Sequence, residues 1–186
     1  VLELSVDNTT KNEVMNHIRQ DGKETHYPVY PGMLLKSTNL RSGLSSMGRT
    51  IFPFGGISDT TVVHTNENGY WMQYKSDKYG FHNNAEAYGS ARTDILITGD
   101  SFAEGWAVRS NENIASVLNA FDLNVVNFGK AGNGPLIEYA VLKEYANSLS
   151  PRIVLWMYYE IDLIDLIYEL NSPLLIRYLT ENNFSQ

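Results

Sequence analysis

The sequence predicts an α/β fold in which a parallel sheet forms the core of the second half of the chain. Three short apolar runs, 95–97, 123–128 and 153–157, are expected to be strands buried on both faces. Helical patterns separate them, and the order strand, helix, strand, helix, strand is typical of parallel strands with right-handed crossovers. Polar or glycine-rich residues follow each run, which predicts a ligand site at the carboxyl ends of the strands.

Two helices are expected between these strands. The first is predicted over 114–121, where apolar residues recur with helical spacing, and Ser110 or Asn111 would cap its N-terminus. The second is predicted over 136–149. Pro135 stands at its start, where proline is tolerated because the first helical N–H needs no partner within the helix.

The chain divides into two regions of different pattern. Residues 1–90 are expected to form a β-rich segment that packs on the α/β core of residues 91–186. Within the first region, residues 60–74 predict a β-hairpin that begins with β-branched residues. Asn68 and Gly69 both tolerate positive φ and predict a two-residue turn for this hairpin.

Composition excludes several classes of function. The formal net charge is -7 and the sequence has no basic run, so binding to nucleic acid is not expected. The absence of cysteine excludes a disulfide scaffold, a cysteine nucleophile and thiolate metal sites, and does not identify the compartment. No stretch approaches the roughly 18 apolar residues of a membrane span, so no membrane span is expected.

Ser101 is the candidate nucleophile. It follows the first predicted strand directly after Gly99 and Asp100, and free backbone N–H groups at such a strand-to-helix turn can stabilise an oxyanion. The alternative is that Asp100 or Ser101 only caps the following helix, which is the more frequent role of an isolated Asp-Ser pair.

Three segments resemble the sequence blocks of the SGNH/GDSL hydrolases, in the same order and with similar spacing. Residues 94–105 resemble the first block, whose serine is the nucleophile, and residues 125–133 resemble the second. Residues 151–162 resemble the strand that leads into the third block, and residues 74–83 resemble the lead-in of some bacterial members. The resemblance implies a three-layer α/β/α sandwich of the flavodoxin-like (SGNH hydrolase) kind.

The resemblance also implies an activity, namely ester hydrolysis or acyl transfer without a cofactor. Ser101 would attack the ester carbonyl, and the N–H groups of Ser101 and Gly132 would stabilise the oxyanion together with the Asn133 amide. Asp100 would shape the turn. The expected substrate is a small acyl ester or an O-acetylated glycan.

Two departures from the family pattern bear on this activity. Ile161, beside Asp162, stands where the third block supplies an oxyanion asparagine, and Asn133 or a shift of one residue would have to replace that donor. The family's general base is a histidine three residues after an aspartate, and no Asp-x-x-His occurs in the sequence. Either the chain is a fragment that is incomplete at its C-terminus, or His64 or His82 approaches Ser101.

Two competing functions are left open. One is a catalytically inactive domain of the same fold that binds a glycan or a protein partner, and the other is a flavodoxin-like phosphate- or nucleotide-binding module. The acidic residues Glu160, Asp162 and Asp165 are interpreted as the solvated start of a helix rather than as a metal site. The apolar residues of 163–170 predict a helix face that belongs to the core or to an oligomer interface.

Overall fold

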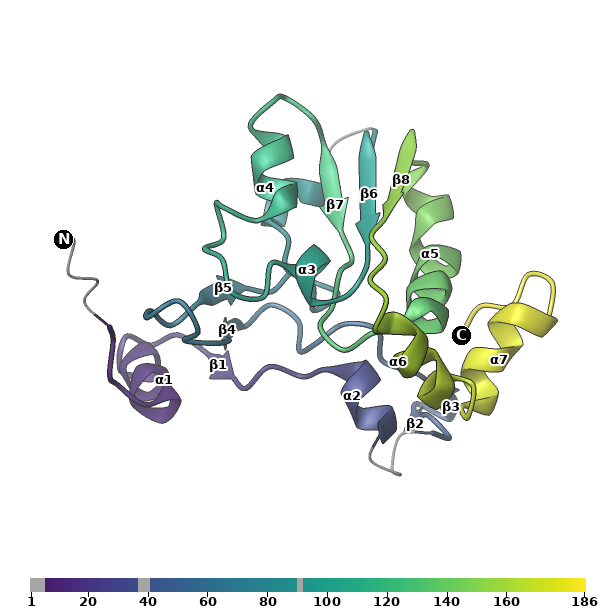
Figure 1. Cartoon of the computed structure of the whole chain (residues 1–186), viewed down its shortest axis with the longest axis horizontal. Helices are drawn as coiled ribbons and strands as arrows, with labels where there is room; N and C mark the ends of the chain where they lie inside the picture. The colour runs from purple at the N-terminus through teal and green to yellow at the C-terminus, as the bar shows by residue number, and fades with distance from the viewer. Residues whose placement is uncertain (1–5, 37–40, 90–91) are drawn as a thin grey trace.

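The computed structural model describes residues 6–36, 41–89 and 92–186, and it shows a mixed α/β architecture (Figure 1). The second half contains a parallel three-stranded sheet in the order β7-β6-β8. Its strands are β6 (Ile95–Thr98), β7 (Val125–Asn127) and β8 (Ile153–Trp156). The predicted parallel sheet is therefore confirmed, with strand bounds that differ by one or two residues from the apolar runs.

The helices that connect the strands lie where the sequence places them. The short α3 (Ser101–Glu104) follows β6, α4 (Ile114–Asn119) precedes β7, and α5 (Pro135–Leu149) joins β7 to β8. Figure 1 shows α4 beside β7 at one edge of the sheet and α5 beside β8 at the other. Proline 135 occupies the first turn of α5, as predicted.

The N-cap predicted for α4 is wrong by two or three residues. Asn113, rather than Ser110 or Asn111, accepts the hydrogen bond of the Ser116 N–H in its side-chain oxygen, at 2.8 Å. Serine and asparagine are both favoured N-cap residues, so residue type alone did not distinguish the three positions.

Strand β8 lies at an edge of the sheet, and its side chains are only partly covered by the described residues. The four residues Ile153–Trp156 are 38–57% exposed, whereas the residues of β7 are buried. The prediction that all three apolar runs are buried on both faces is therefore wrong for the third run. Two helices follow β8, namely α6 (Asp162–Glu169) and α7 (Pro173–Thr180), and the outer face of α6 is also exposed and apolar.

The N-terminal region contains short strands and helices together. Its elements are α1 (Lys11–Gln20), β1 (Thr25–His26), α2 (Pro31–Lys36), β2 (Leu44–Ser46), β3 (Arg49–Ile51), β4 (Thr61–Val63), β5 (Gln73–Lys75) and the 3-10 helix η1 (Ala85–Tyr88). Strands β1, β4 and β5 form one small sheet, and β2 pairs with β3. The region packs on the α/β core through aromatic residues, such as Phe81, whose ring centroid lies 4.9 Å from that of Phe128.

The predicted hairpin is formed by β4 and β5, which pair antiparallel. Its turn is built differently from the predicted one, because the Gly69 N–H donates to the Asn66 carbonyl at 3.2 Å. Glu67 and Asn68 are therefore the central residues of a four-residue turn. Gly69 follows them with φ of 79°, the left-handed conformation that glycine adopts at the end of such turns.

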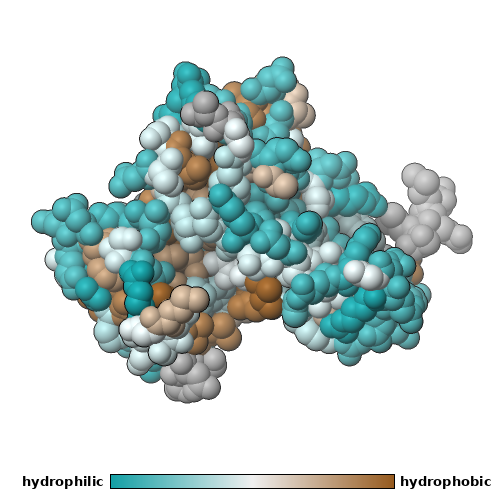
Figure 2. Space-filling view, turned by 180° about the vertical axis from the view of Figure 1, so that it is seen from behind, coloured by the Kyte–Doolittle hydropathy of each residue, from teal (hydrophilic) through white to brown (hydrophobic). Residues whose placement is uncertain are grey.

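The surface seen from behind is mostly hydrophilic, and its hydrophobic residues gather in the lower left, on the side that carries α6 and α7 (Figure 2). None of the helices in the described ranges combines the length and the apolar character that crossing a membrane requires.

Candidate active site

Ser101 lies at the carboxyl end of β6 and begins α3, as the sequence predicts. The helix is capped by Asp100, whose Oδ1 accepts a hydrogen bond from the Phe102 N–H at 2.9 Å. Neither the Ser101 hydroxyl nor its backbone N–H bonds to any other described residue. The capping role therefore belongs to Asp100, and the hydroxyl of Ser101 is available for another partner.

The glycine turn after β7 supplies two more donors without partners. Gly132 adopts φ of 77°, and its N–H donates to no other residue of the described chain. Asn133 is fully buried. Its Oδ1 accepts from the Gly32 N–H at 3.3 Å, while its Nδ2 has no hydrogen-bond partner among the described residues. A buried amide donor without a partner is costly, which marks this turn as a place where an acceptor would be bound favourably.

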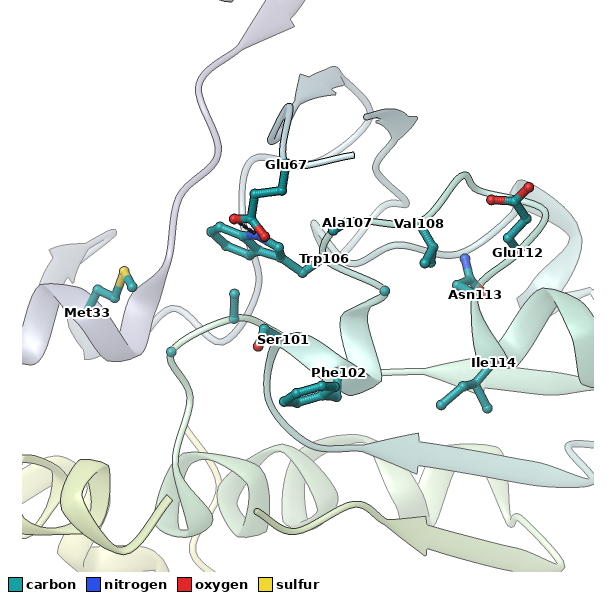
Figure 3. Close-up of a pocket in the computed structure, with 13 residues that line it drawn as sticks. Met33, Glu67, Ser101, Phe102, Trp106, Ala107, Val108, Glu112, Asn113 and Ile114 are labelled. Carbon is teal, nitrogen blue, oxygen red and sulfur yellow. Dashed lines mark hydrogen bonds between the residues drawn. The ribbon is translucent and has the colours of Figure 1, made fainter. Parts of the chain in front are cut away.

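Ser101 and Gly132 line the same pocket, which has a volume of about 560 Å³ (Figure 3). Most of its other lining residues are apolar or aromatic: Met33, Phe102, Trp106, Ala107, Val108, Ile114 and Ala131. Asp100 and Asn133 are not among the lining residues. The structure thus brings Ser101 and Gly132 together at one cavity and places Asp100 and Asn133 behind its wall.

A buried ion pair connects α3 to the glycine turn. The Glu104 carboxylate lies 2.6 Å from Lys130 Nζ, accepts the Ala131 N–H at 2.8 Å and accepts the Tyr74 hydroxyl at 3.0 Å. Burial alone would raise the pKa of Glu104, but the Lys130 ammonium and its hydrogen bonds outweigh burial and hold the pKa well below its usual range. The pair fixes residues 130 and 131, which precede Gly132, to the helix that carries Ser101.

Helix α2 from the N-terminal region packs directly on this turn. A Cβ atom added at Gly32 would lie 1.7 Å from the Gly132 carbonyl oxygen, so the two backbones touch. The side chain of Met33 lies against Gly132 on the pocket side. The N-terminal region is therefore part of the site, although its sequence shows no motif for such a role.

The histidines that were considered as alternative bases make their contacts elsewhere. His82 Nδ1 donates to the Glu104 carbonyl at 3.0 Å, its Nε2 lies 3.1 Å from Ser110 Oγ, and burial lowers the pKa of His82 to about 4. His64 Nδ1 donates to the Trp106 carbonyl at 2.9 Å, and its Nε2 lies 3.5 Å from Glu104 Oε1. Neither ring forms a hydrogen bond with Ser101.

A second group of buried acids lies near the end of β8. Trp156 Nε1 donates to Glu138 at 2.5 Å, and Glu138 Oε1 and Asp162 Oδ1 have no partner in the described chain. Burial raises the pKa of Glu138 to about 8, and the negative charges of Asp162 and Glu169 add to the effect. Ile161 is 51% exposed, and its side chain has no group that could donate to an oxyanion at the position where the resemblance implies an asparagine.

The described residues contain no cluster of three or more side chains suited to a metal ion. Comparison with known proteins adds no identification, since no family model, no curated protein and no solved structure gave a significant match to this chain.

Sequence reasoning missed Met33, Glu67 and Trp106 as lining residues of the pocket. Met33 and Glu67 lie 68 and 34 positions before Ser101 and belong to no recognisable motif. Trp106 follows Gly105, and an indole so soon after a candidate nucleophile was a signal that could have been used.

Proposed function

We propose that this chain is a serine-dependent ester hydrolase or acyl transferase with Ser101 as its nucleophile. The observation that carries the proposal is the hydroxyl of Ser101, which has no partner in the described chain and lies on the wall of an apolar pocket that Gly132 also lines. The parallel sheet and the order of the three resembling segments support an SGNH-type fold. We accordingly propose that the chain has the three-layer, flavodoxin-like arrangement with a β-rich N-terminal segment.

The reaction would proceed by nucleophilic catalysis. Ser101 Oγ forms a bond to the ester carbonyl carbon, and its proton passes through a base to the leaving alcohol as the C–O bond breaks. Water then cleaves the acyl-enzyme in hydrolysis, whereas a second alcohol does so in acyl transfer. The N–H groups of Ser101 and Gly132, two residues that line the pocket, would donate to the oxyanion. The Asn133 amide, expected from the sequence as a further donor, lies behind the pocket wall and is given no part in this step.

The proposal requires a base from outside the contacts described above. His64 and His82 are engaged with residues 104–110, and the remaining two, His17 and His26, belong to α1 and β1. A serine hydroxyl without a base is a weak nucleophile. The function is therefore best tested with a base supplied from solution.

The test is hydrolysis of p-nitrophenyl acetate with and without added imidazole. We expect turnover that depends on Ser101 and rises with imidazole concentration. Since imidazole itself cleaves this ester, the Ser101→Ala variant at the same imidazole concentration is the matched control. Equal rates for the two proteins at every imidazole concentration would overturn the proposal.

The second candidate is a catalytically inactive domain of the same fold that binds a glycan or a protein partner. The observation that favours it is that no histidine is hydrogen-bonded to Ser101, together with the apolar Ile161 at the position where the resemblance implies an asparagine. Specific glycan binding without turnover that depends on Ser101, even with imidazole, would select this candidate.

A further inference from the structure

The pocket beside Ser101 is more apolar than an acetyl group requires. Phe102 and Met33 are 63% and 46% exposed although they flank the candidate nucleophile, so both present apolar surface to water. Figure 3 shows Met33 to one side of Ser101 and Val108 and Ile114 to the other, with Trp106 above and Phe102 below. A ligand that covered these side chains would gain the free energy of burying apolar area.

Trp106 is held in place as the upper wall of this pocket. Its indole Nε1 donates to Glu67 at 2.9 Å, and its carbonyl accepts from the buried His64 at 2.9 Å. The rings of Trp106 and Tyr30 lie with their centroids 5.2 Å apart. Glu67 and Tyr30 both belong to the N-terminal region, so that region fixes the position of the wall.

The charges of the pocket restrict what it can accept. Glu67 and Glu112 line it with exposed carboxylates, of which Glu112 pairs with Arg109 at 3.3 Å, and no lysine, arginine or histidine is among its lining residues. The Glu67 carboxylate would repel an anionic ligand at this opening, whereas it would not repel an uncharged apolar chain. A volume of about 560 Å³ lies within the range of small-molecule sites and exceeds what an acetyl group fills.

We infer that this pocket takes the acyl group of the ester as an uncharged chain longer than acetyl, and that the N-terminal region forms part of the apolar wall, directly through Met33 and indirectly by holding Trp106. The inference rests on the proposed function, since it treats Ser101 as the group that attacks the ester carbonyl. With the ester carbonyl held at Ser101, the acyl chain of the substrate would extend along the apolar wall, toward Val108 and Ile114 or toward Met33.

The first test is a chain-length series of p-nitrophenyl esters from acetate to octanoate, assayed with imidazole. We expect kcat/KM to rise by about fourfold for each methylene that is fully buried. Val108→Trp should fill one end of the pocket and lower the octanoate-to-acetate ratio, and Met33→Ala should lower it by removing apolar contact. The matched controls are Val117→Trp and Met47→Ala, which change exposed residues outside the pocket and should leave the ratio at its wild-type value.

The second test separates this inference from the proposed function. Binding of 1-octanol to the Ser101→Ala variant, measured by titration calorimetry, requires the pocket but no chemistry. Saturable binding that Val108→Trp or Met33→Ala weakens at least tenfold, without any turnover that depends on Ser101, would support the pocket while the hydrolase proposal fails. Turnover with a flat chain-length profile, or a profile that neither pocket variant changes, would overturn the inference. Absence of both octanol binding and turnover would overturn it as well.

Discussion

The Lys130 ammonium lies 2.6 Å from Oε1 of Glu104, and the two side chains are 1% and 0% exposed. Both charges have left water, so the pair depends on close contact and on the further bonds to Tyr74 and the Ala131 N–H. It also joins the two halves of the site, because Glu104 lies on the helix of Ser101 and Lys130 begins the turn that contains Gly132. Stability and site geometry are therefore expected to change together.

Removing one partner of this pair should be strongly destabilising. We expect Glu104→Gln to lower the free energy of unfolding by about 3–5 kcal/mol, because it leaves the Lys130 ammonium buried without a counter-charge. The measurement is urea denaturation at neutral pH. The double variant Glu104→Gln/Lys130→Met should be less destabilised than the sum of the two single variants, and simple additivity would contradict the buried pair.

Gly32→Ala should move α2 away from the glycine turn. The new Cβ would lie 1.7 Å from the Gly132 carbonyl oxygen, which the backbones can relieve only by separating. We expect a loss of about 1–3 kcal/mol in the free energy of unfolding, as for other overpacked sites. We also expect a fall in the Ser101-dependent hydrolysis described above, since the Gly132 N–H would shift.

The control is Gly89→Ala, where φ is -86° and the nearest atom to the added Cβ, the Glu86 carbonyl oxygen, is 3.3 Å away. Equal effects of the two substitutions would contradict the close approach of α2.

The close contact between Gly32 and Gly132 shows which parts of the structure the sequence could predict and which it could not. Apolar runs and Pro135 were sufficient to predict β6, β7 and the start of α5, because those signals depend on neighbours in the chain. The contact of Gly32 with Gly132 joins residues 100 positions apart, and no local pattern records it.

In the candidate site, too, the features that depend on local sequence were predicted and those that depend on distant segments were not. The Ser101 turn and Gly132 were predicted from local pattern and resemblance, and both line the pocket. Glu104, Lys130 and Glu138 are buried ionisable residues, whereas residues of these types usually lie at the surface. Their burial depends on partners from other segments, and so it became visible only in the structure.

Glu138 should make the protein less stable as the pH rises. Its ordinary pKa is 4.5 and burial raises it to about 8, so between these values the unfolded chain is ionised there while the folded chain keeps the proton. The penalty grows from about pH 4.5 and is complete above about pH 8. We therefore expect Glu138→Gln, which keeps an acceptor for the Trp156 indole, to be more stable than wild type at pH 8.5, by on the order of 3 kcal/mol.

The measurement is urea denaturation of both proteins at pH 4.5 and pH 8.5. The difference between them should be small at the lower pH and large at the higher one. Glu160→Gln removes the same formal charge from an exposed position and serves as the control. A difference between wild type and Glu138→Gln that does not change with pH would show that Glu138 is ionised in the folded protein across this range.

The open edge of β8 should cause the chain to self-associate. Its backbone donors and acceptors on one side have no strand beside them in the described chain, and its four side chains remain exposed and apolar on both faces. A further strand that pairs with this edge would bury both the backbone groups and the apolar side chains, and a second copy of the chain can provide one.

We expect the weight-average mass from sedimentation velocity to rise with protein concentration. Ile153→Lys, at a residue that is 57% exposed, should suppress this rise because a charge on the edge disfavours strand addition. Val117→Lys introduces the same charge on α4, away from β8, and should leave the association unchanged. A wild-type chain that stays monomeric at all concentrations, or equal suppression by both lysines, would contradict association through β8.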